Sequence, residues 1–373
     1  MPKVDQVKGR RAGLGMRGHD EEQAFQGFTL FSANTGPGEV FLIDMEGNVA
    51  HTWNMPYPPG LYGYITENED GRPTLFYNGK VTDPEDESFV GKAPWKGGAV
   101  LEADWDGNIL RELKHPDHHH DARKLRNGNV VLLCITELEE AFQKKVRGGR
   151  AGAEAEGNKM FADYIVEMTW DGEEVWRWNS WEHVDPWTHG IAAPNESREE
   201  WTHGNTVFEM SDGNLLVSFR NPSKVIIIDR QTGDVKWHIG PPHIAQQHAP
   251  NELDNGNILI FDNGTSRLNH NIPHSRVIEV DPATNEIVWS YQEKYPSDFF
   301  SPLISNASRL PNGNTLICEG SFGRFFEVTK EGEVVWEYVN PHFYKVSDEP
   351  DALVSNRVFR CYRYSPEVIA RMR

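Results

Sequence analysis

The sequence predicts an all-β protein folded as a six-bladed β-propeller. Three observations support this fold class. One hairpin pattern recurs six times, a second hairpin precedes most of these copies, and each end of the chain carries a strand that lacks a partner in its own repeat. Two hairpins per repeat supply four strands, which is the content of one propeller blade. Helical periodicity is almost absent, which argues against an α/β protein.

The recurring hairpin joins two runs of β-branched and aromatic residues through a short Gly or Asn turn, and its second run often ends near a tryptophan. Such runs around a short turn are typical of a β-hairpin. The six copies begin at Val40, Ala99, Tyr164, Val225, Val277 and Phe325. The preceding hairpin turns at Asn127–Asn129, Asp212–Asn214, Asn255–Asn257 and Asn312–Asn314, with a degenerate version at 65–77. We expect the tryptophans to pack between blades.

The remaining blade needs an inner strand from elsewhere in the chain. The run at 27–33 is a second strand with no first strand before it, and the run at 356–364 is a strand with no blade after it. Pairing these two runs closes the ring and removes two exposed sheet edges. The sequence therefore predicts a propeller closed by its N-terminal and C-terminal strands.

This repeat pattern defines the expected domain organisation. Residues 27–365 form a single propeller, preceded by an extension at 1–26 and followed by a C-terminal tail at 366–373. Two segments interrupt the repeat. The charged, Gly- and Ala-rich segment at 138–159 is expected to be a mobile insertion, whereas the aromatic, proline and acidic residues at 181–200 predict a lid over one face.

The composition restricts partners and location. The 373 residues include 37 Lys and Arg against 56 Asp and Glu, giving a formal net charge of −19. Nucleic acids and anionic membranes bind basic surfaces, so neither is an expected partner. There is no apolar run of membrane-spanning length and no signal-like N-terminus, so we expect a cytoplasmic protein. Cys134, Cys318 and Cys361 lie in strand-like runs, and we expect buried thiols without disulfides.

Histidines precede several of the Asn-Gly-type turns. The inner strand of a propeller blade starts beside the central channel, and His120, His203 and His248 fall near these starts. The next blade has Asn306 at the corresponding place, and Arg220 ends the second strand of its blade on the same face. Three imidazoles and a guanidinium at related positions indicate a reactive pocket for a small anionic molecule that carries a sulfate, phosphate or carboxylate.

The other histidines have different expected places. Of the neighbours His118, His119 and His120, we expect only one to point into the channel. His189 repeats the local string WTHG of His203 but precedes no strand pattern, so we assign it to the lid. Surface positions in connecting loops are expected for His238, His243, His270 and His274.

These strings resemble the arylsulfate sulfotransferase family. The resemblance covers most of the chain from Gly27 to His342, and it depends on H-x-N at His203, S-x-R at Ser218, Q-H at Gln247 and F-D-N-G at 261–264. It implies a six-bladed propeller that transfers a sulfuryl group between phenols without a nucleotide donor, by ping-pong chemistry through a sulfated histidine. Water as acceptor would give a sulfohydrolase.

The resemblance also implies roles for individual residues. His248 would be the nucleophile, His203, Asn205 and Arg220 would bind the sulfuryl oxygens, and His120 would assist proton transfer. An aromatic residue of the family pocket corresponds to Tyr62 or Tyr64, and we assign Tyr64 to substrate binding together with Asn205 and Asn306. Exported bacterial members also have a signal, an extra N-terminal domain and a disulfide, which this sequence does not show, so its substrate can differ.

Two further functions are compatible with the residues. His120, His203 and His248 could ligate one divalent metal ion in the channel of a lyase or hydrolase. A propeller without catalytic activity could instead use one face as a binding platform, although a platform does not need buried imidazoles. The leading hypothesis requires no cofactor, and a homodimer is left open as the oligomeric state.

Overall fold

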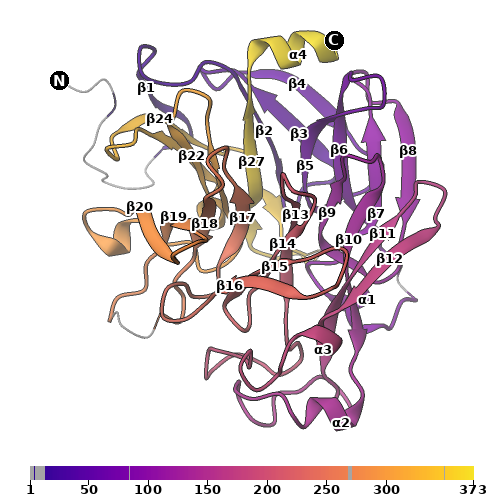
Figure 1. The fold of residues 1–373 in the computed structure, drawn as a ribbon. Helices are drawn as coiled ribbons and strands as arrows, with labels where there is room; N and C mark the ends of the chain where they lie inside the picture. Colours follow the sequence, from indigo (N-terminus) through magenta and orange to yellow (C-terminus); the bar gives the residue numbers. More distant parts are fainter. Residues whose placement is uncertain (1–3, 5–12, 84, 268–270, 348) are drawn as a thin grey trace. The chain divides into compact units, whose positions relative to one another are not determined.

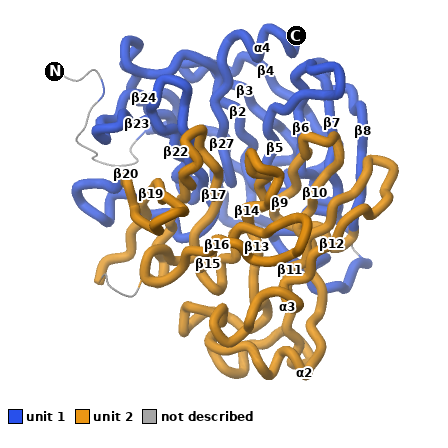
Figure 2. The backbone as a smooth tube through the Cα atoms, viewed as in Figure 1, with its two compact units in different colours: residues 1–115, 291–373 blue, residues 116–290 orange. Residues whose placement is uncertain are grey.

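The computed structural model describes Val4 and residues 13–83, 85–267, 271–347 and 349–373, and these are mostly β-structure (Figure 1). Their strands form six sheets of four or five strands and one two-stranded ribbon. The six larger sheets are the blades of a six-bladed β-propeller, so the predicted fold class is confirmed. The blades belong to two compact units: residues 1–115 with 291–373 form unit 1, and residues 116–290 form unit 2 (Figure 2).

Unit 1 contains the blade that closes the propeller. Its strand order is β27-β2-β3-β4, with β27 at Val358–Tyr364, β2 at Phe28–Ala33, β3 at Glu39–Ile43 and β4 at Val49–Asn54. Strands β2 and β27 are antiparallel, with Phe28 opposite Tyr364 and Ala33 opposite Val358. The predicted pairing of the N-terminal and C-terminal strands is therefore confirmed.

Two more blades complete unit 1. One contains β5 (Pro59–Glu67), β6 (Pro73–Lys80), β7 (Gly98–Ala103) and β8 (Ile109–Lys114). The other contains β21 (Asn306–Arg309), β22 (Thr315–Glu319), β23 (Arg324–Val328) and β24 (Val334–Val339), and β1 (Gly15–His19) adds a fifth strand beside β24. The shorter elements are α1 (Phe89–Lys92), η1 (Pro296–Asp298), η2 (Gly320–Phe322), β25 (Tyr344–Lys345), β26 (Val354–Ser355) and α4 (Pro366–Met372).

Unit 2 contains three consecutive blades. The first has β9 (His118–Lys124), β10 (Val130–Glu137), β11 (Phe161–Met168) and β12 (Glu174–Asn179). The second has β13 (Gly204–Glu209), β14 (Leu215–Phe219), β15 (Lys224–Ile228) and β16 (Val235–Ile239). The third has β17 (His248–Glu252), β18 (Ile258–Asp262), β19 (Arg276–Asp281) and β20 (Glu286–Tyr291). Two short helices, α2 (Glu140–Gln143) and α3 (Ser180–His183), lie between strands.

The repeated Asn-Gly turns have a local physical origin. In the β9–β10 turn, the Asn127 side-chain oxygen accepts a hydrogen bond from the Asn129 backbone N–H at 3.0 Å, and Gly128 has φ of +89°. The β17–β18 turn repeats this arrangement, with Asn255 bonded to Asn257 at 3.0 Å. A short polar side chain thus closes the turn, and a glycine takes the left-handed conformation that other residues avoid.

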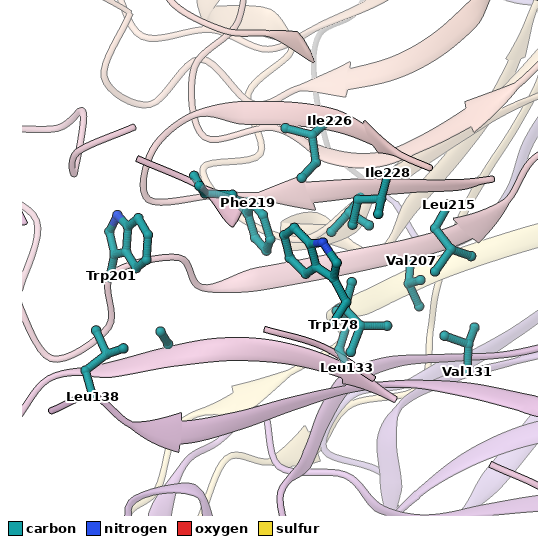
Figure 3. Close-up of a cluster of buried hydrophobic side chains, with 14 of the residues drawn as sticks. Val131, Leu133, Leu138, Trp178, Trp201, Val207, Leu215, Phe219, Ile226 and Ile228 are labelled. Carbon is teal, nitrogen blue, oxygen red and sulfur yellow. The ribbon is translucent and has the colours of Figure 1, made fainter. Parts of the chain in front are cut away.

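Tryptophans at the hairpin ends pack between neighbouring blades, as the sequence predicted. Trp178 ends β12, is 1% exposed and donates its indole N–H to the Gly233 carbonyl of the next blade at 2.8 Å. Figure 3 shows Trp178 among the apolar side chains of that blade, including Leu215 and Ile228. The blades of unit 2 are therefore joined by apolar burial together with an indole hydrogen bond.

The three cysteines are buried free thiols, which confirms the expectation for them. Among the described residues, no helix is both long and apolar enough to cross a membrane.

Candidate active site

The predicted site histidines of unit 2 lie where the inner strands begin, and the backbone there is irregular. His120 and His203 both have φ of +47°, and in the third strand the corresponding left-handed conformation belongs to Ala249, next to His248. Each of the three inner strands also has a register irregularity against its neighbour. Such bulges redirect side chains and are common beside active sites.

His120 belongs to a chain of buried polar groups. Its Nδ1 lies 2.8 Å from Nδ1 of His119, and Nε2 of His119 lies 2.8 Å from the Asp163 carboxylate on β11. A carboxylate favours a proton on the facing nitrogen, so neutral His119 carries its proton on Nε2 and accepts from His120 Nδ1–H. Neutral His120 then has its lone pair on Nε2, where it can accept or return a proton.

None of the three neighbouring histidines faces solvent, and which of them points into the channel stays a prediction. His118, His119 and His120 are 1%, 0% and 4% exposed. In a regular strand, adjacent side chains point to opposite faces. The left-handed conformation at His120 breaks this alternation, and the rings of His119 and His120 therefore meet.

His203 lies directly beside His120. Their ring centroids are 4.7 Å apart in an edge-to-face arrangement, and Nδ1 of His203 lies 2.9 Å from the Glu200 carboxylate. Glu200 belongs to the predicted lid segment, three residues before His203. This carboxylate plays the same part for His203 as Asp163 plays for His119, because it fixes the proton on one ring nitrogen and leaves the other as the basic atom.

Arg220 is also held by a carboxylate from the lid segment. Its Nη1 lies 2.9 Å from Glu196 Oε2 and donates to Asn221 Oδ1 at 3.0 Å. The same Glu196 oxygen accepts from the Gln246 amide at 2.6 Å. Arg220 therefore already binds an oxyanion, which is the type of group that the sequence predicted it would bind.

A polar network connects the second and third blades of unit 2. The Asn205 amide donates to the Gln247 carbonyl at 2.9 Å, and Thr206 Oγ accepts from the Ala249 N–H at 3.0 Å. The side chain of Gln247 donates to Ser218 Oγ at 2.9 Å and to the Lys224 carbonyl at 2.9 Å. The residues on both sides of His248 are thus held in place, and Asn205 contributes to this by positioning the backbone.

His248 has a defined hydrogen-bond partner. It is 2% exposed, and its Nδ1 lies 2.8 Å from the Asn263 side-chain oxygen. A carbonyl oxygen only accepts, so Nδ1 of His248 must carry the proton. In the neutral ring, the lone pair then lies on Nε2. Asn263 belongs to the F-D-N-G string, and the structure shows what the asparagine of that string does.

The carboxylates of this site were missed by the sequence reasoning. Burial alone would raise the pKa of Asp163, but hydrogen bonds from His119, Thr202 and the Gly204 N–H lower this pKa below its usual value. Burial likewise acts to raise the pKa of Glu196, and the charge of Arg220 outweighs it and lowers the pKa. Both groups are therefore anionic at neutral pH. The acidic composition of 181–200 was the available signal for Glu196 and Glu200.

Asn306 and Tyr64, predicted to bind substrate, belong to unit 1. Asn306 begins β21, and both ends of its amide bond the Cys361 backbone, at 2.9 and 3.0 Å. This arrangement joins β21 to β27. Tyr64 on β5 packs against Phe76 and Tyr362, with ring centroids 5.1 and 6.3 Å apart. Nearby, the fully buried guanidinium of Arg360 lies 4.4 Å from the ring of Tyr62, a cation that the sequence reasoning did not identify.

The remaining histidines divide between correct and wrong expectations. His243 is an exposed loop residue, as expected, whereas the assignment of His189 to a lid stays a prediction. His238 was expected in a loop but belongs to β16, and His274 was expected at the surface but is 4% exposed, with Nδ1 2.9 Å from the Ile272 carbonyl. His270 lies outside the described residues.

The metal alternative has limited support from side-chain placement. Nδ1 of His120 and of His248 each has a hydrogen-bond partner, and Nδ1 of His203 lies 2.9 Å from the Glu200 carboxylate, an arrangement that also suits metal-ligating histidines. Within the part of the chain that the structure describes, no group of three or more His, Cys, Asp or Glu side chains is placed to hold a metal ion.

Comparisons with solved structures concern the fold. A Bacteroides caccae protein of unknown function matches with a TM-score of 0.50 at 15% identity, over 84% of this chain and 93% of that chain. A streptogramin B lyase structure matches with a TM-score of 0.47 at 11% identity, over 98% and 97%. Virginiamycin B lyase from Staphylococcus aureus matches with a TM-score of 0.44 at 12% identity, over 85% of both chains.

Comparison with sequences identifies the family. No curated protein matches the chain. The family model described as arylsulfotransferase (ASST) matches residues 95–341, which include the whole of unit 2 with its histidines, Arg220 and Asn263. This match covers more than half of the chain and supports a sulfotransferase-like function. The protein belongs to the arylsulfotransferase family.

Proposed function

We propose that this protein transfers a sulfuryl group from an aryl or alkyl sulfate ester to a hydroxyl acceptor or to water, through a covalent sulfohistidine at His248. The observation that carries the proposal is the 2.8 Å contact between His248 Nδ1 and Asn263 Oδ1. This contact keeps the proton on Nδ1 and makes Nε2 the nucleophilic atom of a neutral imidazole. The family match supports the reaction class.

The first half-reaction follows from this assignment. His248 Nε2 attacks sulfur, so the N–S bond forms while the S–O bond to the donor breaks. The electron pair of that bond leaves with the donor oxygen, which takes the Nε2 proton of His120 or His203 in its imidazolium form and leaves the neutral ring for the second half-reaction. Arg220 stabilises the negative charge of the sulfuryl oxygens, because cationic groups fixed beside developing charge lower the barrier.

The second half-reaction reverses these bond changes with a different oxygen. The acceptor hydroxyl gives its proton to His120 or His203, and its oxygen attacks sulfur. The O–S bond forms, the N–S bond breaks, and its electron pair returns to His248 Nε2. Asp163, acting through His119, and Glu200 keep the Nδ1 proton of His120 and His203 in place throughout, which prepares both rings for general acid–base catalysis at Nε2.

The test is to incubate the protein with 4-nitrophenyl sulfate and to measure intact mass and peptide masses. We expect one SO₃ adduct on the peptide that contains His248, and no adduct and no 4-nitrophenol release from His248→Ala. His243→Ala is the matched control, since this exposed histidine lies five residues away in the same segment. Phenol release by His248→Ala at the wild-type rate would refute the proposal.

The metal-dependent alternative is separated by a second measurement. If His120, His203 and His248 ligated a divalent ion for a lyase or hydrolase, the purified protein would bind that ion, and each Nδ1 partner would orient a ligand. Metal analysis and activity in the presence of a chelator distinguish the two functions. Activity that depends on a bound metal, without a histidine adduct, would support the alternative.

A further inference from the structure

We propose that unit 2 contains a second binding site, a pocket for a small aromatic anion, next to the candidate active site. The pocket has a volume of about 410 Å³, which suits a small molecule. It lies between the two insertion segments and the loops around β15 and β17. Its charged lining residues are Arg147, Lys224 and Arg267, and none of the described lining residues is an aspartate or a glutamate.

The excess of positive charge is the first argument. In a chain of net charge −19, three cations around one pocket without a lining carboxylate are an unusual local concentration. Arg267 has a partner outside the lining, because its guanidinium lies 2.9 Å from Asp262, which also binds Arg276 at 2.8 Å. The single negative charge of Asp262 is therefore shared by the guanidinium groups of Arg267 and Arg276, and the net charge of these three groups is positive.

Of the three cations that line the pocket, Lys224 has the fewest described neighbouring groups that offset its charge. Among the described residues it has no ion pair, and burial lowers the pKa of its ammonium group. Nearby histidines respond to it: burial and then the charge of Lys224 lower the pKa of His189, to about 4, and of His238. A half-buried ammonium beside two neutral imidazoles is stabilised by any anion that enters the pocket.

An aromatic wall indicates the class of anion. Trp187 lines the pocket and is 63% exposed, which is unusual for a large aromatic side chain, and the Arg147 guanidinium stacks 3.7 Å from its ring centroid. An aromatic ring that stacks on Trp187 would bring its anionic substituent into the same cavity as Lys224. Ser223 and Ser266 add polar hydroxyl oxygens to the lining of the same site.

The pocket and the candidate active site share structural residues. Ser223 follows Arg220 closely, and its N–H donates to the Arg220 carbonyl at 3.0 Å. Ser266 donates to the Gln246 side chain at 3.1 Å, and Gln246 in turn binds Glu196, the partner of Arg220. A ligand that moves Ser223 or Ser266 would therefore act on the groups that hold Arg220. The pocket itself does not depend on the sulfuryl-transfer proposal.

The experiment measures binding of 2-naphthalenesulfonate by isothermal titration calorimetry. Its C–S bond does not take part in sulfuryl transfer, and 2-naphthol and inorganic sulfate test the ring and the anion separately. The main variant is Lys224→Met, which keeps the apolar stem, with Lys236→Met as matched control because Lys236 is exposed on the neighbouring strand β16. Arg220→Ala reports binding at the candidate active site.

We expect Lys224→Met to weaken binding at least about tenfold, since a charge-assisted contact is lost, and Lys236→Met and Arg220→Ala to leave it within about twofold of wild type. Arg147→Ala, at an exposed position, should also weaken binding and gives the same test if Lys224→Met does not fold. Equal affinity of the Lys224 and Lys236 variants would overturn the proposal, as would loss of binding in Arg220→Ala alone. Failure of the histidine-adduct experiment has no bearing on either result.

Discussion

Replacement of Asn263 by alanine tests the tautomer assignment at His248. In the wild type, the Asn263 oxygen accepts from Nδ1 at 2.8 Å, and His248 is 2% exposed, so solvent cannot readily replace this acceptor. Loss of the partner of a buried donor costs about 1–3 kcal/mol. Without the Asn263 oxygen, the Nδ1–H tautomer of His248 is no longer favoured. Fewer neutral His248 rings then present a lone pair on Nε2.

The same energy sets the size of the kinetic effect. Because 1.4 kcal/mol corresponds to a tenfold change, Asn263→Ala should slow adduct formation on His248 by about 5- to 150-fold. Single-turnover mixing with 4-nitrophenyl sulfate measures this rate directly as phenol release. KM should change less than kcat, since Asn263 acts on the nucleophile and not on the bound ester.

Two control variants make this result specific. Asn257→Ala removes an asparagine from the β17–β18 turn of the same blade and should leave the adduct rate near that of the wild type. Asn263→Asp keeps an acceptor and should retain more activity than Asn263→Ala, with the pH at which activity appears moved upward, because a carboxylate raises the pKa of the imidazole. An Asn263→Ala protein that is folded, by its thermal unfolding midpoint, and forms the adduct at the wild-type rate would refute the assignment.

The remaining predictions concern the carboxylates. Glu196→Gln removes the anion that competes for Arg220, so KM for the sulfate ester should fall by about 3- to 10-fold; a KM that is unchanged or higher would contradict this competition. Asp163→Asn removes the buried carboxylate that faces His119 Nε2–H and should reduce the unfolding free energy in urea by about 1–3 kcal/mol at pH 7. The pKa of Asp163 is lower in the folded state than in the unfolded state, so its stabilising contribution is present above the ordinary carboxyl pKa and is lost as pH falls toward the lowered value. The difference in unfolding free energy between wild type and Asp163→Asn should therefore shrink below about pH 4. An advantage that grows in acid would contradict the pairing.

The repeating part of the fold could be predicted because its signals are local. The Asn127–Asn129 turn and its equivalents close within three residues, and the alternation around them defines the strands. The closing pair β2 and β27 could be predicted by elimination, as two strands without partners. The pairing of β1 with β24 could not, because Gly15–His19 has two glycines and no run of β-branched residues to mark it as a strand.

The sequence could place the histidines of the candidate site in the fold, but it could not place the carboxylates beside them. His120, His203 and His248 precede recognisable turns, so their place in the strands follows from the repeat. Asp163 comes from a neighbouring strand and Glu196 from an irregular segment, and no local pattern places either of them. The bulge at His120 also could not be predicted, because it breaks the alternation on which strand assignments depend.

The carboxylates beside the site cations mean that a sulfate ester must compete with them in order to bind. His119, His203 and Arg220 each lie within 3 Å of a carboxylate, so the cluster is not an open positive pocket. An anionic ester gains little there unless it takes the place of one carboxylate. Glu196 is the one best suited to leave, because it comes from the irregular segment at 181–200 and its side chain is 23% exposed, whereas that of Asp163 is 0% exposed. Substrate binding should therefore be coupled to movement of the segment around Glu196. This coupling would favour anions that bind Arg220 strongly enough to displace the Glu196 carboxylate.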